Sequence, residues 1–270
     1  MKNLKTLINY KSFFSLKNKN IIIFGGAGKL GKSFSLSLLS AGAKVFILDK
    51  NFPVKLNKKI IYMRCDVTSK TNVMECFQSI LKKVKKIDTI IYNVYSKPVN
   101  YYKSFEDYDF KTWQEALTTN LSGAFLVCQK AIQHFKKKKI HGNIILVSST
   151  YGIVGPDNRI YDNLKSNLYG GKFKLNSPAV YGASKSGLIG LMRNLATSYG
   201  KFNIRVNCLS PGGVFDGHEK QFYNQYKSRV PLNRMATETD YNGAIIFLSS
   251  DASRYMTGSN LIIDGGWTAW

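Results

Sequence analysis

The stretch Asn20-Ile-Ile-Ile-Phe-Gly-Gly-Ala-Gly-Lys-Leu-Gly31 decides the fold of this chain. It begins as a short apolar run, passes through a glycine-rich turn and leads to Ser33–Ala41, where apolar residues recur with helical spacing before Gly42. Such a pattern predicts a buried strand, a tight turn and a helix. Glycines in this turn let the backbone approach a pyrophosphate, toward which the N–H groups of the helix N-terminus point. The stretch therefore predicts a dinucleotide-binding unit.

Further strands and helices alternate along the chain. Strands are predicted at Lys44–Leu48, Ile60–Arg64, Asp88–Tyr92, Asn143–Ser148, Ile204–Leu209 and from Thr257 to Gly266, and helices at Lys70–Lys85, Phe110–Phe135 and Ala179–Tyr199. Strands that alternate with helices of this length form crossovers that cover both faces of a parallel sheet. We expect an α/β fold, with a single Rossmann-type, doubly wound parallel sheet flanked by helices on both faces. Ligands bind such sheets at the carboxyl ends of the strands.

Asp49 stands at the predicted carboxyl end of the second strand. A carboxylate in that place can accept both hydroxyls of an adenosine ribose, and it repels a 2′-phosphate. This favours NAD over NADP, although Lys50 and Lys29 could pair with the extra phosphate. The alternative is that Asp49 is a solvated turn residue.

The 270 residues are consistent with one domain spanning 1–270, because no linker, repeat or break in composition interrupts them. Residues 1–15 form a basic N-terminal extension. Neither Met1–Lys19 nor any later stretch has the apolar run of a signal peptide or a membrane span. We therefore expect a cytoplasmic protein without a membrane partner.

Cysteines and histidines are scattered through the chain. They are Cys65, Cys76, Cys128, Cys208, His134, His141 and His218. The cysteines fall singly inside predicted elements, and no pair has the spacing of a zinc site or a redox motif. We expect reduced, buried cysteines and no metal.

The net charge of +23 arises from 39 Lys and Arg against 16 Asp and Glu. Its densest run, Lys136–Lys139, falls at a predicted helix end, where cations complement the helix dipole. No recognition helix, zinc finger or aromatic RNA-binding motif accompanies the charge. We interpret it first as compositional bias and second as steering of an anionic substrate, and we do not expect nucleic-acid binding.

The stretch Tyr181-Gly-Ala-Ser-Lys185 places a phenol and an ammonium on one face of a predicted helix. A free tyrosine keeps its proton until about pH 10, so acid–base work near neutrality needs a fixed positive charge beside it. Lys185 is placed to supply that charge. Because the same spacing occurs on ordinary exposed helices, the pair indicates catalysis only together with other motifs.

Several motifs follow one another in a single order. They are Gly25–Gly31, Asp66, Asn93, Asn120, Ser149, Tyr181, Lys185, Pro211-Gly212 and Asp264-Gly265-Gly266. The whole resembles the classical short-chain dehydrogenase/reductase family, from about Leu16 to Trp270. The resemblance implies an NAD(P)-dependent enzyme that interconverts a secondary alcohol and a ketone, assembled as a homodimer or homotetramer.

By that resemblance, Tyr181 is the general acid–base and Lys185 lowers its pKa and holds the nicotinamide ribose. Ser149 contacts the substrate oxygen, and Asn120 joins a water relay to Lys185. Ser148 competes for the serine role, but Ser149 precedes a glycine by three residues, as in the family. The implied cofactor contacts are Gly25, Gly28, Lys29, Leu30, Gly31, Asp49, Asp66, Val67, Asn93, Tyr181, Lys185, Pro211, Gly212 and Val214.

The sequence departs from the family pattern in several places. Lys29 replaces a loop glycine and puts a cation where the pyrophosphate is expected, Val94-Tyr95-Ser96 replaces small residues, and Asp216 stands where a threonine is common. Ser149 and Tyr181 lie 32 positions apart, more than twice the usual spacing. We interpret residues 155–177 as an insertion at the substrate site, because long loops in compact domains are often functional.

The insertion is rich in Tyr, Asn, Lys and Gly, which suit a sugar, and its cations Arg159, Lys165, Lys172 and Lys174 could meet a phosphate. The alternative is a solvated loop used for subunit contact. These features resemble oxidoreductases of flagellin modification and nonulosonic-acid sugar pathways. That branch implies an amino-sugar, sugar-phosphate or nucleotide-sugar substrate. The competing interpretations are a 3-oxoacyl-carrier-protein reductase, a general alcohol dehydrogenase and a non-catalytic dinucleotide-binding scaffold.

Overall fold

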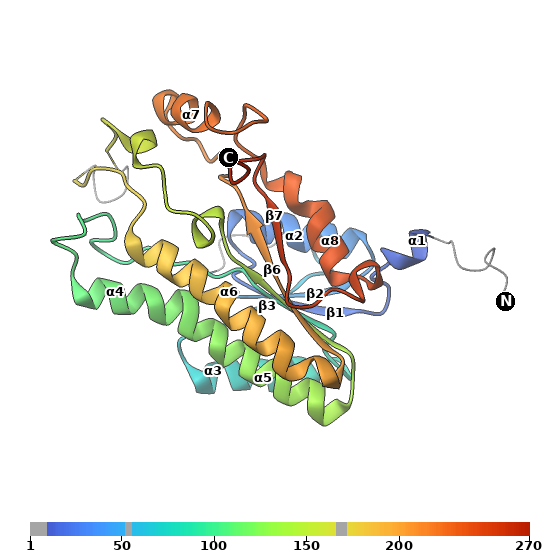
Figure 1. The fold of residues 1–270 in the computed structure, drawn as a ribbon. Coiled ribbons are helices and arrows are strands. Elements are labelled where there is room, and N and C mark those ends of the chain that lie inside the picture. Colours follow the sequence, from blue (N-terminus) through green and yellow to red (C-terminus); the bar gives the residue numbers. More distant parts are fainter. Residues whose placement is uncertain (1–9, 52–55, 166–171) are drawn as a thin grey trace.

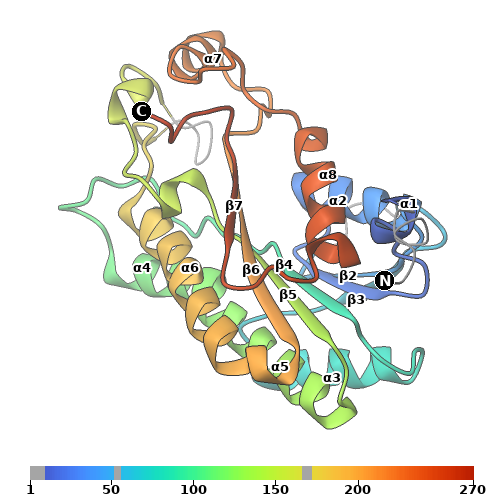
Figure 2. The same ribbon diagram turned by 45° about the vertical axis from the view of Figure 1, so that its right-hand side comes forward.

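In the part of the chain that the structure describes, seven strands form one parallel sheet in the order β3-β2-β1-β4-β5-β6-β7 (Figures 1 and 2). The computed structural model describes residues 10–51, 56–165 and 172–270. The strands are β1 Asn20–Phe24, β2 Lys44–Asp49, β3 Ile61–Arg64, β4 Thr89–Tyr92, β5 Gly142–Val147, β6 Ile204–Pro211 and β7 Asn260–Ile263. The strand order reverses between β1 and β4, which is where open α/β sheets bind their ligands. The predicted α/β fold is confirmed.

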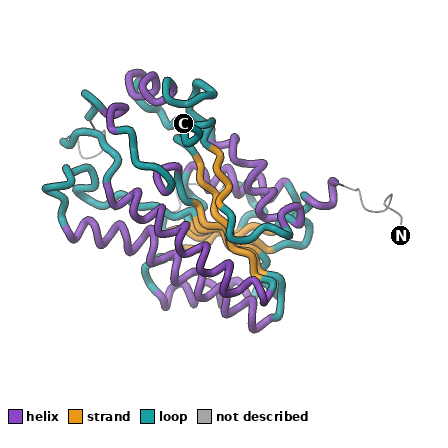
Figure 3. The backbone as a smooth tube through the Cα atoms, viewed as in Figure 1, coloured by secondary structure: helices purple, strands orange, loops and turns teal. Residues whose placement is uncertain are grey.

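Helices cover both faces of this sheet (Figure 3). They are α1 Tyr10–Phe13, α2 Lys29–Ser40, α3 Lys70–Leu81, α4 Phe110–Leu117, α5 Gly123–Lys138, α6 Ala179–Tyr199, α7 Lys220–Lys227 and α8 Asn242–Ser249. Helices α2 and α8 lie on one face, and α3, α5 and α6 lie on the other (Figure 1). Part of the basic extension, residues 1–9, and part of the insertion, residues 166–171, lie outside the described residues.

The two faces of β1 build two separate cores. Ile22 and Phe24 join the core beneath α3, α5 and α6. Ile21 and Ile23 join the core beneath α2 and α8. This alternation follows from the two-residue period of a strand, and it explains why strands covered on both faces are apolar throughout. All four cysteines are free and buried, as predicted.

Two helix boundaries differ from the prediction. Helix α2 begins at Lys29 rather than Ser33, so Gly31 lies inside its first turn. A Cβ on Gly31 would lie 2.3 Å from the Gly25 carbonyl oxygen, so this glycine allows the helix to start against the turn. Helix α3 ends at Leu81 rather than Lys85, because the lysine-rich residues after it offer little apolar surface to the sheet.

The helix predicted over Phe110–Phe135 is interrupted. A π-helical turn, Thr118–Ser122, separates α4 from α5 and carries the buried Asn120. In this wider turn the Thr119 carbonyl accepts a hydrogen bond from the Tyr92 hydroxyl of β4. Such turns occur frequently at functional sites, and this one resolves why an Asn occupies the middle of a helical pattern.

Candidate active site

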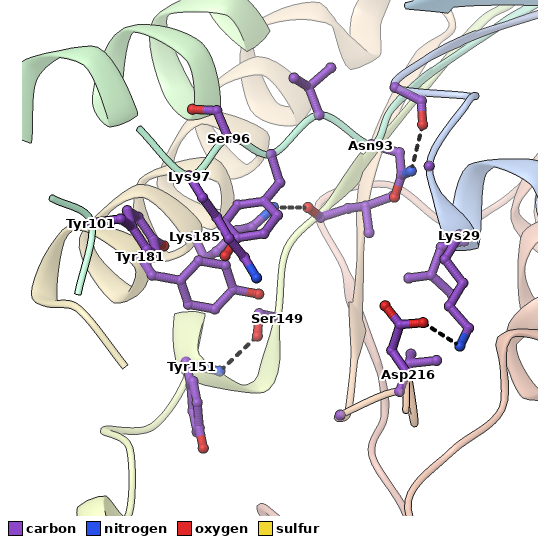
Figure 4. Close-up of a pocket in the computed structure, with 18 of the residues that line it drawn as sticks. Lys29, Asn93, Ser96, Lys97, Tyr101, Ser149, Tyr151, Tyr181, Lys185 and Asp216 are labelled. Atoms are coloured by element: carbon purple, nitrogen blue, oxygen red, sulfur yellow. Dashed lines mark hydrogen bonds and ion pairs between the residues drawn. The ribbon is translucent and has the colours of Figure 1, made fainter. Parts of the chain in front are cut away.

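A cavity of about 1010 Å³ opens at the carboxyl ends of the strands. One end is lined by Asp49 and Asp66, the middle by Tyr181 and Lys185, and the far end by aromatic residues that include Tyr226. Figure 4 shows its central part. The position is the one that the strand order predicts for a ligand.

The glycine turn forms one wall of this cavity. Gly25 has a φ of +75°, and a Cβ there would lie 2.4 Å from the Asn93 carbonyl oxygen. The Asn93 side-chain amide donates to the Gly25 carbonyl at 3.0 Å, which ties the ends of β1 and β4 together. A Cβ on Gly28 would meet only the Gly25 oxygen, at 3.8 Å, so this residue leaves room in the cavity beside the N-terminus of α2. The turn is shaped to accept an anionic group.

Asp49 and Asp66, which line one end of the cavity, are the residues that could hold the adenosine part of a dinucleotide. Asp49 accepts hydrogen bonds from the backbone N–H groups of Ala27 at 3.0 Å and Asn51 at 3.1 Å. A carboxylate has about four acceptor positions, so Asp49 can also accept two ribose hydroxyls. Hydrogen bonds from Thr68 hold the pKa of Asp66 below its usual value. The neighbouring Val67 packs into the core.

Lys29 does not lie across the glycine turn as the sequence suggested. Its ammonium reaches the loop after β6, where it pairs with Asp216 at 2.9 Å and donates to the Phe215 carbonyl. Glu238 lies 4.0 Å away. The residue therefore links the start of α2 to the loop after β6 at the mouth of the cavity. Leu30, beside it, packs against the core beneath α2.

Tyr181 and Lys185 lie in the first two turns of α6. The Lys185 ammonium donates to the Val147 carbonyl at 2.9 Å and lies 5.9 Å from the centroid of the Tyr181 ring. Burial lowers the pKa of Lys185 to about 8. Burial raises the pKa of Tyr181, and the hydrogen bond with Ser149 opposes that rise. The expected lowering by Lys185 is therefore not seen here, because the ammonium is turned toward Val147 instead of the phenol oxygen.

The two neighbouring serines have different surroundings. Ser149 follows β5, accepts from the Tyr151 N–H at 3.2 Å, and faces the Tyr181 hydroxyl (Figure 4). Ser148 donates its hydroxyl to the Lys185 carbonyl at 2.8 Å, so it is used in attaching α6 to β5. This arrangement supports Ser149 as the serine that meets a substrate.

Asn120 joins the loop after β4 to α6. Its side-chain oxygen accepts from the Ser96 N–H at 3.0 Å, and its amide donates to the Ser184 hydroxyl at 3.4 Å. The side chain is fully buried. These contacts position the loop after β4. The water relay from Asn120 to Lys185 that the family resemblance implies stays a prediction.

Pro211, Gly212 and Val214 carry the chain from β6 along the cavity wall. A Cβ on Gly212 would lie 2.9 Å from the Asp264 Cα, so the glycine permits close approach of the C-terminal tail. The Gly212 carbonyl accepts from the Tyr241 hydroxyl at 3.0 Å. Val214 forms a β-bridge with Ala236. These contacts hold the wall opposite the glycine turn.

Aromatic side chains that no sequence motif predicted lie around Tyr181. The rings of Tyr95 and Tyr151 lie 5.3 Å and 6.4 Å from the Tyr181 ring, centroid to centroid. Tyr151 lies edge-on to Trp267 near the C-terminus, at 6.3 Å. The Tyr151 and Tyr161 hydroxyls are 3.2 Å apart. The signal in the sequence was its 16 tyrosines, but their convergence is a property of the fold.

Most cations of the insertion are engaged elsewhere. Arg159 pairs with Asp157 at 2.8 Å, and Lys174 lies 3.6 Å from Asp162. Lys172 lies over the Phe173 ring at 5.7 Å. Lys165 does line the cavity. Of the four candidates for a phosphate contact, only this last one lines the same cavity as Tyr181.

The described residues contain neither a cluster of metal ligands nor a membrane-spanning helix. Within residues 10–51, 56–165 and 172–270, no three His, Cys, Asp or Glu side chains gather as metal ligands would. In the same part of the chain, no helix is both long enough and apolar enough to cross a bilayer.

The reversed strand order, the glycine turn and the Ser149–Tyr181–Lys185 group define a Rossmann-type oxidoreductase. The family model described as short chain dehydrogenase matches residues 19–161, and the model described as Enoyl-(Acyl carrier protein) reductase matches residues 164–268. The chain belongs to the short-chain dehydrogenase/reductase family, which confirms the resemblance noted in the sequence.

Curated proteins and solved structures include similar chains of the same length. D-arabinitol 2-dehydrogenase [ribulose-forming] of Candida tropicalis is 28% identical over 95% of this chain and 95% of that protein. Post-translational flagellin modification protein A of Campylobacter coli is 28% identical over 93% of this chain and 99% of that protein. A short-chain dehydrogenase from Leptospira borgpetersenii, solved with bound NAD+, is 33% identical over 96% of both chains, with a TM-score of 0.85. This protein is therefore an NAD(P)-dependent alcohol/ketone oxidoreductase.

Proposed function

We propose that the protein interconverts a secondary alcohol and a ketone on a sugar-type substrate. The observation that carries the proposal is the tyrosine- and amide-lined end of the cavity beside Tyr181, which includes Tyr151, Tyr161 and Asn176. Aromatic faces suit the C–H faces of a sugar, while hydroxyl and amide groups suit its hydroxyls. The name of the arabinitol dehydrogenase, which includes a sugar alcohol and a ketose, agrees with such a substrate.

In this proposal the residues around Tyr181 manage the proton. The bound nicotinamide supplies or accepts the hydride. For reduction, Ser149 donates a hydrogen bond to the ketone oxygen, and Tyr181 delivers a proton to it. The Lys185 ammonium lies 5.9 Å from the centroid of the Tyr181 ring, and it stabilises the resulting phenolate once it turns from the Val147 carbonyl toward the phenol oxygen. Asn120 keeps the loop after β4 in place beside this group through Ser96. Oxidation uses the same groups in the reverse order.

The residues at the other end of the cavity hold the cofactor. The glycine turn and the N-terminus of α2 accept the pyrophosphate, and Asp49 accepts the ribose hydroxyls. Asp49 favours NAD because its charge repels a 2′-phosphate. Lys50, which lies 3.5 Å from Asp66, is the nearby cation that NADP would recruit.

The first test combines cofactor binding with a substrate screen. NADH and NADPH are titrated by fluorescence, and D-arabinitol, D-ribulose, amino-sugar phosphates, nucleotide sugars and an acyl-carrier thioester are then screened at the absorbance of reduced nicotinamide. Turnover of a sugar supports the proposal. Turnover of the thioester alone would contradict the sugar-type substrate and indicate a carrier-protein reductase. Failure to bind either cofactor would favour the non-catalytic scaffold.

Tyr181→Phe tests the proton step separately. The substitution keeps the ring and removes the hydroxyl, so we expect turnover to fall by about 100-fold or more, as loss of general acid–base catalysis does, while NADH affinity stays within about twofold. Tyr62→Phe, on β3, makes the same change outside the cavity and serves as the control. Loss of NADH binding in Tyr181→Phe would assign the residue a cofactor role instead.

A further inference from the structure

We propose that Tyr161 of the insertion, together with Tyr151, binds a substrate hydroxyl group that is remote from the reacting carbon. The inference rests on the proposed function and names the residues that select a polyhydroxylated substrate. Both side chains line the same cavity as Tyr181. Through Tyr161 the insertion therefore takes a direct part in substrate selection.

The part of the insertion that carries Tyr161 is folded against the rest of the protein. Residues Asn158–Tyr161 form a short 3-10 helical turn. Its Ile160 and Tyr161 side chains are buried, and they join a small core with Phe222 of α7 and with Trp267. This packing favours a structured cavity wall over the solvated loop that was the alternative in the sequence.

Asp157 and Asp162, on either side of this turn, attach it to α7 and the residues after it. The Asp157 carboxylate accepts the Arg159 backbone N–H at 3.1 Å and pairs with Arg229, which follows α7. The Gln221 side chain of α7 donates to the Asp162 carbonyl at 3.3 Å. A wall held at both ends has little conformational freedom to lose when a ligand binds.

Three hydroxyl groups form a chain on this wall. The Tyr151 and Tyr161 hydroxyl oxygens are 3.2 Å apart. Burial raises the pKa of Tyr161, and hydrogen bonds with Tyr151 and Ser177 oppose that rise. All three residues line the cavity. Three hydroxyls joined by two hydrogen bonds use two of their three protons, so among the described residues one proton and most of the lone pairs remain for a ligand.

This chain of hydroxyls lies beside the reacting centre but apart from it. The Tyr151 ring lies edge-on to the Tyr181 ring, 6.4 Å away from centroid to centroid. In Figure 4 the Tyr151 hydroxyl lies on the far side of its ring from Ser149. A substrate whose ketone oxygen meets Ser149 and Tyr181 therefore brings a different oxygen, several bonds away, to the hydroxyls of Tyr151 and Tyr161.

Aromatic rings around these hydroxyls favour a neutral hydroxyl group as their ligand. Tyr161 lies 5.7 Å from the Phe222 ring, and Tyr226 stacks on Trp267 at 4.5 Å. A charged group would lose hydration against these rings, whereas a hydroxyl can both donate to the tyrosines and accept from them. An alkyl chain would leave the proton of the hydroxyl chain without a partner, so the site discriminates against it.

Calorimetric titration tests the proposal on the intact protein saturated with NADH. D-Arabinitol and 2-pentanol are the probes, because both have a secondary alcohol at C2 of a five-carbon chain and only the first carries further hydroxyls. With NADH bound, neither alcohol can be oxidised, so the titration measures binding alone.

We expect the wild type to bind D-arabinitol more tightly than 2-pentanol. Tyr161→Phe and Tyr151→Phe should each weaken the binding of D-arabinitol by about two- to tenfold, the loss of one neutral hydrogen bond. The affinity for 2-pentanol should stay within about twofold, because this ligand has no second hydroxyl to lose a partner.

Tyr223→Phe is the matched control. Tyr223 lies on α7 and packs against the same small core, but it is outside the cavity lining. This change should leave both affinities as they are in the wild type. An unchanged NADH affinity in each variant shows that the variant is folded.

The outcomes separate this inference from the function on which it rests. Failure of the wild type to bind NADH would overturn the proposed function itself. With NADH binding intact, equal affinity of the wild type for the two probes, or no binding of D-arabinitol, would overturn the hydroxyl site alone. An unchanged D-arabinitol affinity in Tyr161→Phe would do the same. An equal loss of both affinities in that variant would show that Tyr161 only supports the wall.

Discussion

The Asp49 carboxylate at the end of β2 is the side chain that we expect to set the preference for NAD over NADP. Its two observed hydrogen bonds, from Ala27 and Asn51, orient the carboxylate and leave acceptor positions for a ribose. We expect Asp49→Ala to weaken NAD binding by about tenfold, the contribution of a charged hydrogen bond, and to affect NADP less because a repulsive charge is lost. Fluorescence titration of both cofactors measures the ratio. Asp251→Ala, which removes an acid paired with Lys19, is the control. An unchanged NAD/NADP ratio would remove Asp49 from the ribose site.

Replacing Lys185 should stabilise the folded protein at neutral pH, because burial disfavours the charge of this side chain. The unfolded chain keeps the proton on a lysine up to about pH 10.4, whereas burial lowers the folded pKa to about 8. Below pH 8 the buried charge lowers the free energy of unfolding by about 3 kcal/mol at most. This cost disappears as the pH rises through 8 toward 10.4.

Lys185→Met should therefore raise the free energy of unfolding relative to the wild type at pH 7, and the difference should shrink by pH 10. The lost hydrogen bond to Val147 reduces the gain by about 1 kcal/mol at every pH. Urea unfolding of both proteins at pH 7, 8, 9 and 10 measures this. A difference that does not change with pH would mean that the buried lysine titrates normally.

Between elements, the Lys29–Asp216 ion pair connects the start of α2 to the loop after β6 at the mouth of the cavity. Lys29 directly follows Gly28 of the glycine turn, where we propose that the cofactor pyrophosphate binds. Both side chains are partly exposed, so we expect Lys29→Met or Asp216→Asn to speed NADH release by only about two- to fivefold. The double variant should add little, because both changes break one contact.

Stopped-flow release of NADH at low and high salt measures the effect. Added salt should accelerate release from the wild type and have little effect on Lys29→Met, since screening and substitution remove the same attraction. Lys32→Met, three residues farther into α2 and outside the cavity lining, is the control. Additive effects of the two single changes would show that the residues act separately.

Hydrophobic periodicity did not reveal the interruption between α4 and α5. The pattern over Phe110–Phe135 predicts one helix, because the π turn Thr118–Ser122 contains no Gly or Pro that would mark an interruption. Only the hydrogen bonds of Asn120 to Ser96 and Ser184 show that the turn serves the loop after β4. A residue that is unfavourable in a helix was the one available signal.

For the whole molecule, exposed aromatic side chains indicate association. Phe125 on α5 is 50% exposed and Phe110 on α4 is 71% exposed. We propose a homodimer or homotetramer that covers these helices, because large apolar groups on a surface often mark subunit contacts. Phe125→Glu should lower the mass measured by light scattering after gel filtration. Phe202→Glu, at a ring flanked by Lys136 and Lys201, should leave it unchanged. A monomeric wild type would contradict the proposal.

Local patterns in the sequence were enough to predict the parallel sheet and to pick out Ser149, Tyr181 and Lys185, which line one cavity. These depend on local patterns: apolar runs, glycines at strand ends, and two residues one helical turn apart. Which side chains line the cavity beside Tyr181 depends instead on the tertiary structure. Arg159 and Lys174 look available in the sequence, but nearby carboxylates pair with them. The rings of Tyr95 and Tyr151 gave no signal in the sequence, because their place beside Tyr181 depends on segments that only the fold brings together.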